Sequence, residues 1–184
     1  IAFPVAGTGQ GSTNSPMVWA FISSVLFEVH QSKAYMMKMS SPDADITVQL
    51  NMIGFVDDST SVTEGDPSKP VEDLLMRIQE DAQLWQDLLW RSGGNLELEK
   101  CSYHCVFYTY DNDDQLVMLR QVPGNVKLVR TNLTDVTIRQ KNIYQLRKNL
   151  GHHKSPARTY NRQVQAILQV ADEISEAISK SGVS

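Results

Sequence analysis

The sequence is poor in cysteine, with Cys101 and Cys105 as the two examples among 184 residues. Two cysteines cannot build a disulfide framework, so the chain is not a small scaffold held together by disulfides. No basic segment followed by an apolar run opens the chain, as it would in a secretory signal. We therefore expect an intracellular protein of the cytoplasm or nucleus that is not secreted.

Long hydrophobic runs are missing as well. The most apolar stretch, residues 17–29, is interrupted by Ser23, Ser24 and Glu28. It is shorter than the ~20 apolar residues that span a bilayer, so we expect no membrane partner. Internal repeats and low-complexity segments are also absent. What is present is 41% apolar residues, enough to bury the core of roughly one domain.

Charge is strongly segregated along the chain, although the net charge is only −4. Residues 43–99 contain thirteen Asp or Glu against three Lys or Arg. Residues 120–162 contain ten Lys or Arg against Asp135 alone. Such a division is compatible with an acidic half that holds metal ions and a basic half that faces phosphates, or with two solvated faces that have no partner.

The first half of the chain predicts a helix, a hairpin and a second helix. Ser15-Pro16 is typical of a helix start and precedes an almost wholly apolar segment, which predicts a buried helix. Residues 46–56 are rich in β-branched types and stop at Asp57-Asp58, ahead of a short extended stretch, which predicts a hairpin with two acids at its tip. Pro70 then opens an amphipathic helix that Gly93-Gly94 ends.

The second half predicts strands followed by a helix. Residues 96–110 alternate as a strand does, and residues 115–120 and 126–130 flank a Pro123-Gly124-Asn125 turn as a second hairpin. Ser155-Pro156 predicts the start of a last helix, whose apolar face comprises Tyr160, Val164, Ile167, Leu168, Ala171, Ile174 and Ile178. The order of elements indicates an α+β fold with an antiparallel sheet.

Asp57 and Asp58 are a candidate metal site. Two adjacent carboxylates repel one another unless a cation lies beside them, and Mg²⁺ prefers oxygen ligands. An Asp-Asp pair at a turn is also ordinary turn chemistry, so the dipeptide alone leaves both interpretations open.

Three ordered blocks, however, are similar to the palm of the reverse transcriptases. Residues 7–16, GTGQGSTNSP, resemble the glycine-glutamine-glycine loop that precedes a helix in that family. Residues 53–58, IGFVDD, resemble its aromatic-x-Asp-Asp hairpin, and residues 94–101, GNLELEKC, resemble its glycine, apolar stretch and lysine. Residues 149–156, NLGHHKSP, resemble the Leu-Gly segment of the LINE-like, non-LTR retrotransposon enzymes.

The resemblance implies a two-metal nucleotidyl transfer. Asp57 would bind two Mg²⁺ ions, for which Mn²⁺ can substitute, and Asp58 would support it as a weaker or indirect ligand. Lys100 would lie near the leaving phosphates, where a cation offsets developing charge, although a solvated lysine on a strand is an equally good interpretation.

The resemblance also implies the substrates and the residues that contact them. The partners would be an RNA template, a DNA primer and deoxynucleoside triphosphates. Gly9, Gln10 and Gly11 would form the floor under the incoming nucleotide and template base, where a missing Cβ allows close approach. Phe55 would pack under the primer end. The oligomeric state stays open.

The implied architecture is a palm-like antiparallel sheet packed on helices in residues 1–150, with residues 151–184 leading into a helical thumb. Gly9 stands where the family usually carries proline, which favours a more flexible loop. The family also needs an aspartate on a strand upstream of the glycine-glutamine loop. We expect the chain to be a fragment that lacks this aspartate and the fingers, and to be inactive in isolation.

Two other groups of residues suggest different sites. Cys101, His104 and Cys105, with His152 and His153, could suggest zinc, but thiolates four residues apart on a strand lie ~13 Å apart, too far to share one ion. Trp85 and Trp90 could stack on bases, but Trp85 falls in the apolar stripe of its helix and is expected in the core. For the whole chain, a non-catalytic nucleic-acid-binding relic of a retroelement and an RNA-directed RNA polymerase palm remain alternatives.

Overall fold

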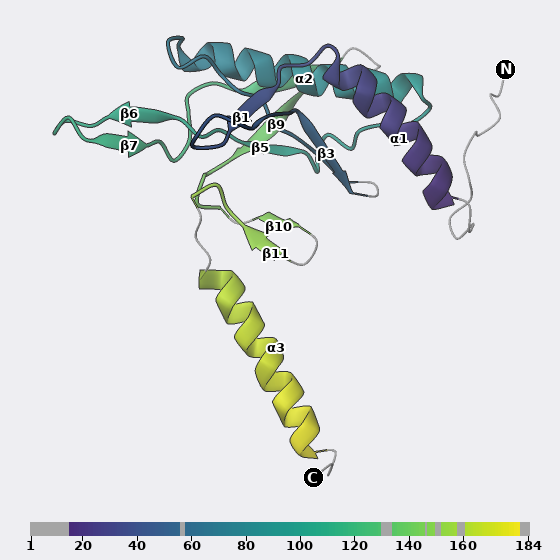
Figure 1. Ribbon diagram of the computed structural model, residues 1–184, viewed down its shortest axis with the longest axis vertical. Coiled ribbons are helices and arrows are strands. Elements are labelled where there is room, and N and C mark those ends of the chain that lie inside the picture. The colour runs from purple at the N-terminus through teal and green to yellow at the C-terminus, as the bar shows by residue number, and fades with distance from the viewer. Residues whose placement is uncertain are drawn as a thin grey trace. The chain divides into compact units, whose positions relative to one another are not determined.

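A computed structural model of the chain describes residues 15–55, 58–129, 134–145, 147–149, 152–157 and 161–180 (Figure 1). The helices are α1 (Ser15–Gln31), α2 (Val71–Arg91) and α3 (Asn161–Lys180). The strands are β1 (Met37–Ser40), β2 (Thr47–Leu50), β3 (Met52–Phe55), β4 (Asp58–Ser61), β5 (Ser102–His104), β6 (Tyr108–Tyr110), β7 (Leu116–Met118), β8 (Val126–Val129), β9 (Asp135–Lys141), β10 (Arg147–Asn149) and β11 (His152–Lys154).

The chain divides into two compact units. The first comprises Ile1–Cys101 with Gly124–Arg139, and the second comprises Ser102–Pro123 with Gln140–Ser184. Helices combine with several small sheets, so the α+β expectation is confirmed at that level. Pairing within the described residues is divided among β1–β2, β3–β4, β6–β7, β10–β11 and a sheet of order β5-β9-β8. None of the helices in the described ranges is both long and apolar enough to cross a bilayer.

The core of the first unit lies between α1 and α2. Leu26 of α1 packs with Trp85 and Leu89 of α2, and Trp19, Ile22, Phe27, Met52, Leu88 and Leu96 surround them. Trp85 is 5% exposed, which confirms its expected place in the core. At the end of α2, Gly93 has a φ of 88°, a left-handed conformation that glycine adopts without steric cost.

The expectation that the first helix is buried is wrong. Residues 15–31 do form α1, but Met17 is 75% exposed and Phe21 is 72% exposed. Leu26 and His30, by contrast, are buried on the side that meets α2. An apolar sequence on all sides therefore did not imply burial on all sides, because one neighbouring helix covers one face.

Several strand assignments need correction. The first hairpin exists, but the predicted strand over residues 46–56 is divided at Asn51 into β2, which pairs with β1, and β3, which pairs with β4. The predicted strand over residues 96–110 is interrupted by a turn at 98–100 and again between β5 and β6. The backbone there forms a turn closed by hydrogen bonds and is not extended; the Cys101 N–H, for example, donates to the Leu98 carbonyl oxygen at 3.1 Å.

The second predicted hairpin is also wrong. β7 pairs with β6 across residues 111–115, and β8 pairs with β9, so the Pro123-Gly124-Asn125 segment connects two different sheets. The last helix begins at Asn161, beyond the predicted start at Ser155-Pro156, because residues 156 and 157 form a turn. The short strands β10 and β11 precede it in a segment for which the sequence analysis predicted no strands.

Candidate functional site

The β3–β4 hairpin carries the Asp-Asp motif at its turn. Phe55 ends β3 and Asp58 begins β4, and the two residues face one another in the strand register. Asp58 is exposed. The predicted hairpin is therefore confirmed by its paired strands. Val56 and Asp57 lie outside the described residues, as does the side chain of Phe55, so the structure describes one of the two predicted acids.

A close contact with α1 holds the base of this hairpin. Gly54 lies against the ring of Phe27, and a Cβ at position 54 would stand 2.6 Å from Phe27 Cε2. Phe27 in turn stacks on Trp85 of α2, with ring centroids 5.3 Å apart. Glycine at position 54 therefore allows the strand to reach a helix surface that is itself anchored in the core.

A buried polar network supports the strand junction between β2 and β3, and sequence reasoning missed it. His30 lies with its ring nitrogens 2.9 Å from Asn51 Oδ1 and 2.9 Å from the Asp81 carbonyl oxygen. The Asp81 carboxylate accepts from the Tyr35 N–H at 2.9 Å and from the Thr63 hydroxyl at 2.6 Å. His30, Asn51 and Asp81 are each at most 2% exposed.

Burial raises the pKa of the Asp81 carboxyl, although its bonds to Thr63 and Tyr35 oppose that shift. The signal in the sequence was the position of Asp81, three residues after Ile78 and four before Trp85, within the apolar stripe of the helix. A charged residue on such a stripe is costly unless partners satisfy it. Its partners lie 18 to 51 residues away in sequence, so the pattern could not identify them.

Lys100 lies in a turn and not on a strand. Its ammonium group donates to Glu97 Oε2 at 2.7 Å, and both side chains are largely exposed. The hydrogen bond and the charge of Lys100 lower the pKa of the Glu97 carboxyl, and Glu97 in the same way raises the pKa of Lys100. The described contact of Lys100 is thus local, and its expected position near phosphates stays a prediction.

The predicted nucleotide floor, Gly9, Gln10 and Gly11, lies outside the described residues. The sequence also predicts a single strand with Cys101, Tyr103 and Cys105 on one face, but β5 covers residues 102–104 alone, so Cys101 and Cys105 flank the strand. Cys105 is 3% exposed, and burial raises the pKa of its thiol to about 11. Within the described ranges, no group of three or more His, Cys, Asp or Glu is arranged to hold a metal ion.

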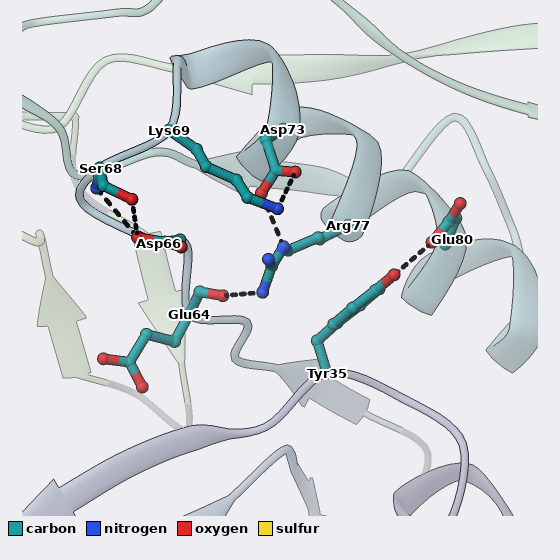
Figure 2. Close-up of polar contacts among 8 residues, drawn as sticks. All are labelled: Tyr35, Glu64, Asp66, Ser68, Lys69, Asp73, Arg77 and Glu80. Carbon is teal, nitrogen blue, oxygen red and sulfur yellow. Dashed lines mark hydrogen bonds and ion pairs between the residues drawn. The ribbon is translucent and has the colours of Figure 1, made fainter.

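Part of the acidic half is engaged in local contacts around α2, which Figure 2 shows. Asp73 accepts from Lys69 at 3.3 Å and from Arg77 at 2.8 Å. Arg77 also donates to the Glu64 carbonyl oxygen at 3.4 Å, and the Tyr35 hydroxyl donates to Glu80 at 2.9 Å. Asp73 thus pairs with cations before and within the first turns of α2, and Glu80 holds Tyr35 against the middle of the helix.

Comparison of the chain with family models, with curated proteins and with solved structures finds no match to any of them.

Proposed function

We propose that the chain is part of the palm of an RNA-directed DNA polymerase of the LINE-like type. The observation that carries the proposal is the Phe-Val-Asp-Asp sequence at the turn of a hairpin, with Phe55 and Asp58 in register. The hairpin contacts α1 at Phe27, which stacks on Trp85 of α2, and these contacts agree with a sheet packed on helices. The ordered blocks at residues 7–16 and 94–101 supply the remaining support.

The exposed position of Asp58 suits a hydrated hard cation. Mg²⁺ in phosphoryl-transfer sites is commonly held by one or two protein carboxylates, with waters and substrate phosphates as its other ligands. Asp57 and Asp58 would hold the metal, which would activate the primer 3′ hydroxyl and stabilise the leaving pyrophosphate. Asp58 is exposed at the start of β4, where a metal-bound substrate could reach its carboxylate.

Primer extension tests the proposal. The polypeptide used in the test has, ahead of this chain, a palm strand that carries the second aspartate of the family. It is supplied with a DNA primer on an RNA template, deoxynucleoside triphosphates and Mg²⁺. We expect extension that Asp57→Asn abolishes and that Asp45→Asn, an exposed acid in the turn between β1 and β2, leaves unchanged. Full activity of Asp57→Asn would exclude the proposal, and incorporation of ribonucleotides alone would favour an RNA-directed RNA polymerase.

The alternative is a non-catalytic module that holds nucleic acid. Arg147, Lys148 and Lys154 lie on the β10–β11 hairpin, and residues 147–154 contain no acid, which favours contact with phosphates. Binding of RNA by the chain should then weaken steeply with salt. Neutralising Arg139, Lys141, Arg147 and Lys148 should reduce that salt dependence, and a salt-independent affinity would exclude the alternative.

A further inference from the structure

The β3–β4 hairpin is held at its base on both strands. The Val62 N–H donates to the Asn51 carbonyl oxygen at 2.7 Å, so the strand pairing continues one residue beyond each strand. The Asn51 side chain lies with Oδ1 2.9 Å from a ring nitrogen of His30. On the other strand, the Thr63 hydroxyl donates to Asp81 Oδ2 at 2.6 Å. One side of the base is thus attached to α1 and the other to α2.

Tyr35 connects these two attachments through its main chain. Its N–H donates to Asp81 Oδ1 at 2.9 Å, and its carbonyl oxygen accepts from the Asn51 amide nitrogen at 3.2 Å. Asn51 and Asp81 are each 2% exposed, and Thr63 is half-buried. Hydrogen bonds shielded from water are electrostatically stronger, and losing one leaves a buried polar group without its partner. The base of the hairpin is therefore held more firmly than exposed contacts would hold it.

One face of the hairpin is attached as well. Met52 packs against the core between α1 and α2, and Gly54 lies against the ring of Phe27. Met52 and Gly54 are alternate residues of β3, so they share a face. This contact and the bonds at Asn51 and Thr63 are three separate attachments that do not lie on one line. Three such attachments fix the orientation of a rigid hairpin.

Asp58 lies at the opposite end of β4 from Thr63. The five residue steps between them span about 17 Å in an extended strand. With an arm of that length, a tilt of about 4° at the base moves the Asp58 end by about 1 Å. Misplacing a reacting group by ~1 Å can slow a reaction about 100-fold. The bonds at the base therefore control the position of Asp58 more sharply than their distance from it suggests.

Asp81 occupies a position where an apolar residue would satisfy the packing of α2. It falls in the apolar stripe between Ile78 and Trp85, and burying a carboxylate has a desolvation cost that an apolar side chain avoids. Both of its oxygens accept bonds from outside the helix, one from Tyr35 and one from Thr63. What the acid adds over an apolar residue is the direction in which these two segments are held.

We propose that Thr63 and Asp81 are positioning residues of the metal site, because their buried hydrogen bond fixes the end of β4 and thereby the place of the Asp58 carboxylate. Both residues act through the strand and touch neither metal nor substrate. The inference rests on the proposed polymerase function, since that function makes Asp58 a metal ligand. It extends the site from the exposed hairpin turn to a buried contact at the hairpin base.

Primer extension by the polypeptide that carries the upstream palm strand tests the inference. Thr63→Val keeps the shape of the side chain and removes its hydroxyl. The variant's kcat should fall about tenfold or more, while KM for the primer–template should change less than about twofold. Thr63→Ser, which keeps the hydroxyl, should restore most of the rate. Gln86→Leu is the matched control, because it removes a buried 2.7 Å bond from α2 to the Val129 carbonyl oxygen and should leave kcat unchanged.

A second measurement needs neither metal nor substrate. In ¹H–¹⁵N spectra of the chain, Thr63→Val should shift the amide signals of Asp58–Ser61, and Gln86→Leu should not, because β4 loses an attachment in the first variant alone. Urea unfolding of both variants compares their losses of stability. Asn51→Leu releases the base of β3 and should also lower kcat, so it serves as the test if Thr63→Val does not fold.

The outcomes separate this inference from the proposed function. Extension that Asp57→Asn abolishes, with normal kcat in Thr63→Val, would overturn the inference and leave the polymerase proposal in place. Equal losses of kcat in Thr63→Val and Gln86→Leu would also overturn it, because general loss of stability would then explain both. Unshifted β4 amides in Thr63→Val would do the same. No extension by the unaltered polypeptide would overturn both proposals.

Discussion

His30 of α1 and Asp81 of α2 are joined through the main chain: ring atom Nε2 of His30 lies 2.9 Å from the Asp81 carbonyl oxygen. The other ring nitrogen faces Asn51 Oδ1 at 2.9 Å. The Asn51 amide nitrogen donates to the Tyr35 carbonyl at 3.2 Å, which turns its oxygen toward the ring. The polar network thus connects both helices to the strand junction that precedes the Asp-Asp hairpin.

The first prediction is that the His30 ring contributes to stability through its two buried contacts. His30→Leu would leave the Asn51 Oδ1 atom and the Asp81 carbonyl oxygen buried without their ring partners, and each such loss costs about 1–3 kcal/mol. Urea unfolding should therefore show a lower midpoint for His30→Leu than for the wild-type chain. An unchanged midpoint would contradict the prediction.

The second prediction concerns pH and Asp81. Burial raises its pKa in the folded state, so the folded chain holds the proton more firmly than the unfolded chain does. The stability that Asp81 contributes is therefore present below its ordinary pKa of 3.8 and is lost as pH rises through the higher folded value.

Urea unfolding of the wild-type chain and of Asp81→Asn at several pH values above 3.8 measures this effect. The stability of the wild-type chain relative to the variant should fall as pH rises. Asp43→Asn is the control, because the Ser41 hydroxyl bond lowers the pKa of Asp43 and the stability that Asp43 contributes therefore changes mainly below 3.8. The difference between wild type and Asp43→Asn should thus be constant over this range. A constant difference between wild type and Asp81→Asn would contradict the prediction.

Third, Gly54→Ala should destabilise the chain by about 1 to 3 kcal/mol, the usual cost of overpacking. The added methyl carbon would lie 2.6 Å from Phe27 Cε2, which is closer than real Cβ atoms approach other atoms. Phe27→Leu in the same chain should recover part of the loss, since the smaller side chain makes room. Denaturant unfolding of the two single variants and the double variant gives the coupling between the sites, and additive losses would show that the contact is unimportant.

Fourth, Lys100→Met should leave the urea midpoint unchanged. The ion pair with Glu97 is exposed, and such pairs contribute little to folding. If Lys100 also serves the proposed polymerase, the same substitution in the active polypeptide should slow nucleotide transfer strongly. A variant with a lower midpoint and normal transfer would show that the lysine is structural.

Fifth, the two thiols should react at different rates. Cys105 is buried with a pKa of about 11, so little thiolate is present near neutral pH, whereas Cys101 is partly exposed. Alkylation of the folded chain followed by peptide mass spectrometry should label Cys101 first. Unfolding in urea should equalise the rates, and equal rates in the folded chain would contradict the burial of Cys105.

Local sequence patterns predicted the elements that depend on neighbours along the chain. The apolar stripe and the terminal glycines fixed α2, and the β-branched residues before Asp57-Asp58 indicated the β3–β4 hairpin. Both depend on contacts three to four residues apart along a helix or across a short turn. The Asp-Asp motif and its resemblance to the reverse transcriptases were likewise identified from the residues alone.

Tertiary structure decided what depended on distant partners. The sequence of β8 is compatible with pairing to β7 or to β9. In the folded chain β8 packs on α2 and pairs with β9. His30, Asn51 and Asp81 are ordinary polar residues until the fold brings them together and removes water. The sequence alone determined the helical stripes and the acidic hairpin turn, because those patterns are periodic and local. Only the fold determined which faces are buried, because burial depends on segments that the chain brings together from far apart.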